Sequence, residues 1–389
     1  MRPHVDQRQA RVRALVQARG SVRVADLARE LGVSPVTLRR DVEAMAARGE
    51  IQRMHGVVSR PVTAPAGQDV GPWAAPAAAR RSGPDRAGAG GGGGLVIGMV
   101  VPTTEYYYAD VVRGAREVVE ARGARLTVGL TRYLPGEDRT QADRLLSTGA
   151  HGLLLTPNWD AGSPGPGEGA WTAELPVPAI LVERWAPPGH PAASLDRVAS
   201  DHAHGAARAV QHLAGLGHRR IALASRETPT SARLRAGFEA AVATLGLEPA
   251  PPWPRPTAAP GPHTGAEASG ESKVFAEAEA FARTLDYLCA AVTEGGVSAA
   301  LIHSDTDAIM LIPRLQARGV RVPEDLAVIT YDDEVAGLAD VPLSAVAPAK
   351  REVGARAAGL LLDRLEGGAA AERGARQHLD LLPRLTIRP

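Results

Sequence analysis

The stretch VPEDLAVITYDD, residues 322–333, decides the fold. Its centre, 326–330, is an apolar run of strand length, and two carboxylates follow it directly. Similar apolar runs recur at 95–101, 125–130, 152–156, 177–182, 221–224 and 299–302. Helical patterns fill most of the gaps, at 109–122, 203–216, 230–245, 275–293 and 305–318. Buried strands that alternate with helices predict parallel βαβ units arranged as two doubly wound lobes.

Composition divides the chain into three parts. Residues 1–60 are dense and periodic, whereas 61–94 are rich in Pro, Ala and Gly and predict a flexible linker. The alternating α/β pattern occupies 95–389. Within it, two Pro- and Gly-rich stretches, 157–169 and 249–270, predict surface loops.

Charge is concentrated in the first part. Residues 1–60 hold twelve arginines and six carboxylates, a net charge of +6, which leaves −5 for the rest of the chain. A basic first domain on a mildly acidic body suggests a polyanionic partner, although chance asymmetry is the alternative.

The cysteine content and the length of the apolar runs indicate in which cellular compartment the protein resides. Cys289 is the only cysteine, which precludes an intrachain disulfide and favours a reducing environment. The first 19 residues lack the apolar core of a signal peptide, and no window reaches the roughly 18 apolar residues of a spanning helix. We therefore expect a cytoplasmic protein without a membrane partner.

Residues 25–48 carry the pattern of two short helices joined by a tight turn. The first apolar stripe stops at Gly32, a common helix terminator. Ser34 then provides an N-cap, and Pro35 occupies the first helical position, where its missing N–H costs nothing. Three apolar residues of the second helix are predicted to face the core: Leu38, Val42 and Met45. The pattern is typical of a helix-turn-helix that inserts its second helix into the major groove, and a three-helix domain with a solvated arginine face is the alternative.

The passage VSPVTLRRDVE, residues 33–43, resembles the recognition helix of DeoR-type regulators, which carry Val-Ser followed by Thr-(Ile/Leu)-Arg-Arg-Asp-Leu. GEIQRMHG, residues 49–56, resembles that family's wing, with Val57 in place of a second glycine. The resemblance covers 7–58 and implies a winged helix-turn-helix domain over 1–60 that binds double-stranded operator DNA. Arginine suits this task because it contacts both guanine edges and phosphates. The residues implied at the DNA are Ser34, Pro35, Thr37, Arg39 and Arg40 in the helix and Arg53 and His55 in the wing.

From residue 95 onward, the motifs resemble those of LacI/GalR-type sensor domains. VPEDLAVITYDD is close to that family's Val-Pro-x-Asp-(Ile/Leu)-x-Val-(Ile/Val)-Gly-Tyr-Asp-Asp, and HLAGLGHRRIAL at 212–223, RAGFE at 235–239 and HSD at 303–305 come in the family's order. The resemblance implies a bilobed, doubly wound, periplasmic-binding-protein-like α/β domain over 95–389. Its implied lobes are about 95–198 with 347–370, and about 199–346 with 371–389.

The resemblance implies an effector site in the cleft between the lobes, and ligands of open α/β sheets bind beyond the carboxyl ends of strands. Tyrosines offer faces for the C–H surface of a pyranose, while carboxylates and arginine suit its hydroxyls. The family's effector-binding arginine falls here on Leu234, so we expect Arg233 or Arg235 to replace it. The expected effector residues are Tyr107, Tyr108, Arg184, Arg233, Arg235, Ser304, Asp305 and Asp332. Packing alone would also explain the tyrosines, and a turn or cap would explain Asp332.

Together the two resemblances imply a sequence-specific transcription regulator, a repressor, controlled by a small effector that is a carbohydrate. They further imply a homodimer, and no cofactor or metal is expected. A solute-binding protein shares the bilobed fold but has no use for the basic residues 1–60. No P-loop, HExxH or nucleophile–base pattern indicates an enzyme. LacI proteins have a hinge helix between their two domains, and the composition of 61–94 does not favour one.

Overall fold

The computed structural model contains two compact units, Met1–Gly88 and Ala89–Pro389, and each is described by itself. The residues that the structure describes are 5–19, 21–23, 27, 30–31, 33, 38, 42, 45, 52–54, 57–59, 94–159, 162–165, 167–253, 270–368 and 374–388. Most of the stretch between the two units, including the predicted linker, therefore lies outside the described residues.

The first unit combines a small helical core with a three-stranded sheet. Helix α1 (Val5–Arg19) precedes strand β1 (Ser21–Arg23), and β2 (Gln52–Met54) pairs antiparallel with β3 (Val57–Ser59). The strand order is β1-β3-β2, so the hairpin occupies the place expected for the wing. One apolar cluster joins the helices: Val12, Val16, Leu27, Leu38, Val42 and Met45. The last three of these were predicted to face the core, and the structure confirms it.

The second unit begins with a parallel six-stranded sheet, which we call the first lobe together with its helices. Its strand order is β13-β8-β7-β6-β4-β5. The strands are β4 (Val96–Val101), β5 (Arg125–Leu130), β6 (Gly152–Leu155), β7 (Ala179–Val182), β8 (Asp196–Ser200) and β13 (His378–Leu381). The helices are α4 (Tyr107–Ala121), α5 (Glu137–Ser147) and α10 (Lys350–Glu366), with short 3-10 turns η1 (Ala170–Ala173) and η2 (Pro191–Ser194).

The second lobe is a five-stranded sheet of order β14-β12-β11-β10-β9. Its strands are β9 (Ile221–Ser225), β10 (Ala299–His303), β11 (Ala327–Tyr331), β12 (Ser344–Ala347) and β14 (Arg384–Thr386), and only β14 runs antiparallel to its neighbour. Its helices are α6 (His202–Gly215), α7 (Ser231–Thr244), α8 (Gly270–Thr293) and α9 (Asp305–Ala317), with the 3-10 turn η3 (Ala336–Leu338).

Helices cover both faces of each sheet, which explains the continuous apolar runs of the strands. In β4, Met99 packs with α4 and α10, whereas its neighbour Val100 packs with α5 on the opposite face. In β10, Leu301 packs with α6 and α7, and Ile302 with α8 and α9. The observed architecture confirms the predicted α/β class with two doubly wound lobes.

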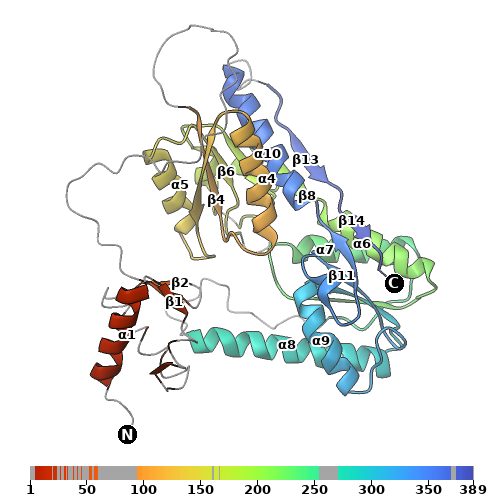
Figure 1. Ribbon diagram of the computed structural model, residues 1–389. Coiled ribbons are helices and arrows are strands. Elements are labelled where there is room, and N and C mark those ends of the chain that lie inside the picture. Colours follow the sequence, from red (N-terminus) through yellow and green to blue (C-terminus); the bar gives the residue numbers. More distant parts are fainter. Residues whose placement is uncertain are drawn as a thin grey trace, which may run out of the picture. The chain divides into compact units, whose positions relative to one another are not determined.

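Two glycines allow α4 and α10 to pack backbone to backbone on one face of the first sheet (Figure 1). A Cβ atom on Gly114 would lie 1.9 Å from the carbonyl oxygen of Arg351, and one on Gly354 would lie 1.9 Å from that of Val111. Contact this close is possible only where neither helix carries a side chain.

The end of the chain corrects the lobe boundaries drawn from the sequence, which assigned 371–389 to the second lobe. β13 instead pairs in parallel with β8 and so belongs to the first lobe, and β14 alone joins the second. The physical reason is the buried carboxylate of Asp196 in β8. It receives two hydrogen bonds from Arg364, at 2.8 and 2.9 Å, and one from the backbone N–H of Gln377, at 2.7 Å.

The chain passes between the lobes at three points: between β8 and α6, between β12 and α10, and between β13 and β14. Within the described ranges, no helix combines the length and apolarity needed to traverse a bilayer.

Candidate functional site

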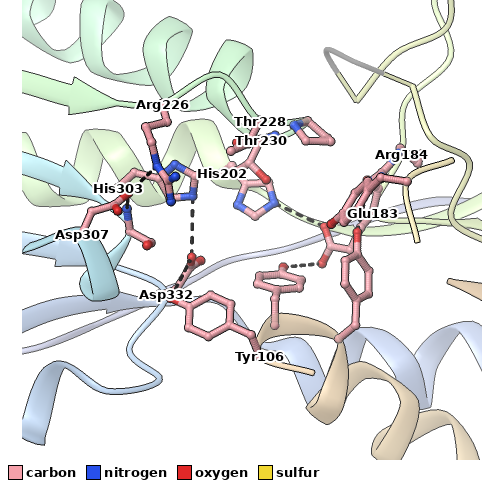
Figure 2. A pocket seen from close by; sticks show the side chains of 15 residues that line it. Tyr106, Glu183, Arg184, His202, Arg226, Thr228, Thr230, His303, Asp307 and Asp332 are labelled. Atoms are coloured by element: carbon pink, nitrogen blue, oxygen red, sulfur yellow. Dashed lines mark hydrogen bonds and ion pairs between the residues drawn. The ribbon is translucent and has the colours of Figure 1, made fainter. Parts of the chain in front are cut away.

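A cavity of about 200 Å³ opens in the second unit at the carboxyl ends of the strands, between the two lobes (Figure 2). The first lobe lines it with Tyr106, Tyr107, Tyr108, Tyr133, Glu183 and Arg184. The second lobe contributes His202, Arg226, Thr228, Pro229, Thr230, His303, Ser304, Asp307 and Asp332. Tyrosines, carboxylates, histidines and guanidinium groups therefore surround one small space.

Glu183, directly after β7, anchors one wall of the cavity. Its Oε1 accepts hydrogen bonds from the Tyr107 hydroxyl at 2.7 Å and from the Ser200 hydroxyl at 2.8 Å. Its Oε2 lies 3.3 Å from Nε2 of His202, which begins α6 in the other lobe. Burial alone would raise the pKa of Glu183, but the hydrogen bonds and charge of His202 and the bond from Tyr107 outweigh it and lower the pKa.

Asp332, directly after β11, is the corresponding carboxylate of the second lobe. Its Oδ2 lies 3.6 Å from Nε2 of His303 and accepts a hydrogen bond of 3.4 Å from the Tyr106 hydroxyl of the first lobe. Burial would raise the pKa of Asp332, but His303 and the positive charge of Lys350 lower it. Burial and the negative charge of Asp332 raise the pKa of Tyr106.

Interactions therefore join the lobes across the cavity, among them Glu183 with His202 and Tyr106 with Asp332 (Figure 2). Because each pair has one member in each lobe, a change in the relative position of the lobes changes these contacts across the cavity. A molecule bound here would contact both lobes at once.

The structure places five of the eight residues expected at the effector on the cavity wall: Tyr107, Tyr108, Arg184, Ser304 and Asp332. Ser304 also caps α9, forming a capping box with Asp307. Arg184, at the end of β7, donates from Nη1 to the Tyr108 hydroxyl at 3.2 Å.

Asp305 does not line the cavity. Its carboxylate is fully buried and accepts the backbone N–H groups of Glu334, Val335 and Ala336 at 2.7, 2.6 and 3.1 Å, together with the Tyr106 hydroxyl. It therefore holds the turn that follows β11 and positions Tyr106.

Arg233 and Arg235 do not line the cavity either. Leu234 between them is fully buried among the apolar residues of α6 and α7, so the two arginines point to either side of it. Arg233 lies over the ring of Trp185, with its Cζ 4.1 Å from the centroid, and Arg235 pairs with Glu227 at 2.7 Å. Neither arginine is therefore on the cavity wall in this structure.

Sequence reasoning missed several cavity residues: Glu183, His202, Arg226, Thr228, Thr230 and Asp307. For Glu183 the signal was present, because it directly follows a predicted strand. His202 carried no such signal, since the strand before it was not recognised.

Most of the expected DNA contacts lie outside the described residues: Ser34, Pro35, Thr37, Arg39, Arg40 and His55. For Arg53 the structure describes only the backbone, within β2.

Family models match three segments of the chain. Residues 8–63 match the DeoR-like helix-turn-helix domain, and 94–254 match the periplasmic binding proteins and sugar binding domain of the LacI family. Residues 210–388 match a periplasmic binding protein-like domain.

The relatives are transcriptional repressors. The arabinose metabolism transcriptional repressor of Geobacillus stearothermophilus is 25% identical over 277 residues, 68% of each chain. The repressor CytR of Escherichia coli is 24% identical over 265 residues, 67% of this chain and 70% of its own. The repressor PurR of Vibrio cholerae is 37% identical over 92 residues, 23% of this chain and 27% of its own.

Solved structures share the fold of the second unit. A complex of the transcriptional regulator CelR with cellobiose has a TM-score of 0.56 and 24% identity, covering 75% of this chain and 83% of its own. A LacI family regulator from Enterococcus faecium with bound ribose has a TM-score of 0.54 and 19% identity, covering 75% and 97%.

Proposed function

We propose that the chain is a transcriptional repressor that responds to a sugar, because it matches a DeoR-like helix-turn-helix domain and the sugar binding domain of the LacI family. The sugar binds in the cavity between the lobes and changes the affinity of the protein for its operator. We further propose that residues 1–60 bind DNA and 95–389 bind the sugar, and that the protein acts in the cytoplasm, where the operator is.

The cavity carries this proposal, because both lobes contribute polar groups to one small space. Tyr107 and Tyr108 offer aromatic faces to the C–H surface of a sugar ring, and Asp332 offers a carboxylate to its hydroxyls. At about 200 Å³, the volume lies below the roughly 300–1,000 Å³ of drug-sized ligand pockets, which favours a monosaccharide. The ribose complex and the arabinose repressor among the similar proteins point to the same class.

We assign operator contact to the second helix and the wing of the first unit. The residues that we assign to base edges and phosphates are Ser34, Pro35, Thr37, Arg39, Arg40, Arg53 and His55. A homodimer places two such helices about one turn of DNA apart, roughly 34 Å, on a palindromic operator.

The response to the sugar depends on the interactions that join the lobes, Glu183 with His202 and Tyr106 with Asp332. A sugar that binds among Tyr106, His202 and Asp332 alters the contacts that fix the lobes relative to each other. Lobe rotation then changes the spacing of the two DNA-binding domains in the dimer.

The test uses the full chain and an operator selected from random DNA by the protein itself. Fluorescence anisotropy of that DNA, titrated with pentoses and hexoses, should show release by at least one sugar. The same sugar at 100 times its dissociation constant should stabilise the sensor domain by about 2.7 kcal/mol in a thermal melt. Absence of any sugar effect on both DNA affinity and melting would refute the proposal.

A further inference from the structure

Arg184 differs from the other charged groups that line the cavity. It is 2% exposed, and its guanidinium donates only to neutral acceptors: the carbonyl oxygens of Pro157 at 2.5 Å and Glu183 at 2.8 Å, and the Tyr108 hydroxyl at 3.2 Å. Among the described residues, no carboxylate lies within 4.0 Å of it. Its Nη2 atom is buried and makes no hydrogen bond within that part of the chain.

The carboxylates of the cavity are already engaged by other donors. Glu183 accepts from Tyr107 and Ser200 and lies beside His202. Asp307 pairs with Arg226 at 2.8 Å. Asp332 is held by Tyr106 and His303, as described above. The positive charge of Arg184 is therefore the one on this wall that the described residues leave without a counter-charge.

A buried guanidinium without a counter-ion is costly, because low dielectric penalises an unpaired charge. A negatively charged partner that accepts hydrogen bonds from the unbonded Nη2 offsets that cost. Figure 2 shows Arg184 on the opposite side of the cavity from Asp307 and His303, so a ligand can direct different groups to the two ends.

We propose that the effector is an acidic monosaccharide whose carboxylate or phosphate pairs with Arg184, while its hydroxyls face the Asp332 end of the cavity. This inference rests on the proposed function, because it names the class of sugar that the same cavity binds. Arg184 and the paired Arg226 are the arginines that the described wall offers.

The experiment compares matched sugars on the full chain by calorimetry: glucose with glucuronate and glucose 6-phosphate, galactose with galacturonate and galactose 6-phosphate, and arabinose with arabinonate and arabinose 5-phosphate. At least one acid should bind about 10- to 100-fold more tightly than its neutral partner, the range expected for hydrogen bonds to a charged group. The class of acid that binds shows whether Arg184 pairs with a carboxylate or with a phosphate.

Arg184→Met should abolish this preference. Arg351→Met, which removes an exposed arginine of α10 that pairs with Glu117 of α4, should leave the ratio unchanged. Where Arg184→Met fails to give a folded protein by circular dichroism, Arg184→Lys decides, since it keeps the charge but loses the planar fork and should reduce the ratio. The comparison of acidic with neutral sugars on the wild-type protein tests the proposal even if no variant folds.

The outcomes separate the two proposals. A neutral sugar that binds as tightly as its acids and releases DNA would overturn the role of Arg184 and leave the proposed function standing. If no member of any set binds, both fall.

Discussion

Asp332 is the residue whose replacement should most directly uncouple the sensor. Changing it to Asn removes the charge that faces Tyr106 and His303, and we expect effector affinity to fall about 10- to 100-fold, as for other charge-assisted hydrogen bonds. The affinity for the operator in the absence of effector should stay at the wild-type value. The matched control is Asp333→Asn, because Asp333 pairs with Arg388 at 2.7 Å and does not line the cavity. Equal effector affinity of both variants would show that Asp332 is a turn residue only.

Glu183 should make the stability of the sensor depend on pH. Its pKa in the folded protein is lowered, so it contributes stability above its ordinary pKa of about 4 and loses that contribution as pH falls through the lowered value. Glu183→Gln should therefore lower the free energy of unfolding by about 3 kcal/mol near neutral pH, as when a buried pair loses one partner. The gap between variant and wild type should narrow below pH 4.

Urea unfolding of both proteins between pH 3 and pH 8 measures this. A gap that is constant across that range would contradict a lowered pKa for Glu183.

The sequence located part of the site because strand ends are visible in it. Tyr107, Arg184 and Asp332 follow predicted strands, and topology brings such residues to one edge. Asp305 follows a strand equally closely, yet it bonds to backbone amides, which only the folded turn at 334–336 reveals. Arg233 does not line the cavity for a different reason. A helix turns by about 100° per residue, and Leu234 takes the inward position.

The crossing of α4 and α10 offers a test of packing at the level of elements. Gly354→Ala places a methyl group against the backbone of α4, and overpacking of this kind costs about 1–3 kcal/mol. Gly359→Ala, on the same helix, meets nothing within 4 Å and should stabilise by about 0.5–1 kcal/mol, since Ala favours a helix over Gly.

Urea unfolding followed by circular dichroism gives both values. If the two alanine variants shift stability in the same direction, the close crossing of the helices is wrong.

Elements with a strong apolar pattern were predictable, and those on polar sequence were not. The helix expected at 203–216 is observed as His202–Gly215, and the strand at 299–302 as Ala299–His303. The sequence did not predict β8, because the buried aspartate and the arginine of its sequence DRVAS interrupt the apolar run that marks a strand. That aspartate is Asp196, whose partners Arg364 and Gln377 come from distant parts of the chain.

At the scale of the whole molecule, DNA binding and ligand binding should be separable. Replacing Arg39 and Arg40 by Ala should reduce specific operator affinity by about 1–3 kcal/mol for each lost base contact. Effector affinity, measured by calorimetry on the same protein, should stay at the wild-type value, because the cavity belongs entirely to the second unit. Unchanged gel shifts would show that these arginines do not read the operator.

The short segment from β13 to β14 has a consequence for synthesis. Residues 378–386 supply one edge strand to each lobe, and every other strand of both sheets precedes them in the chain. During translation the DNA-binding unit emerges first, and domains generally fold in that order. Neither lobe has its full set of strands until these residues have been made. A chain released just before them therefore carries the DNA-binding unit with two unfinished sheets, in which β8 and β12, strands that normally lie inside their sheets, become open edges.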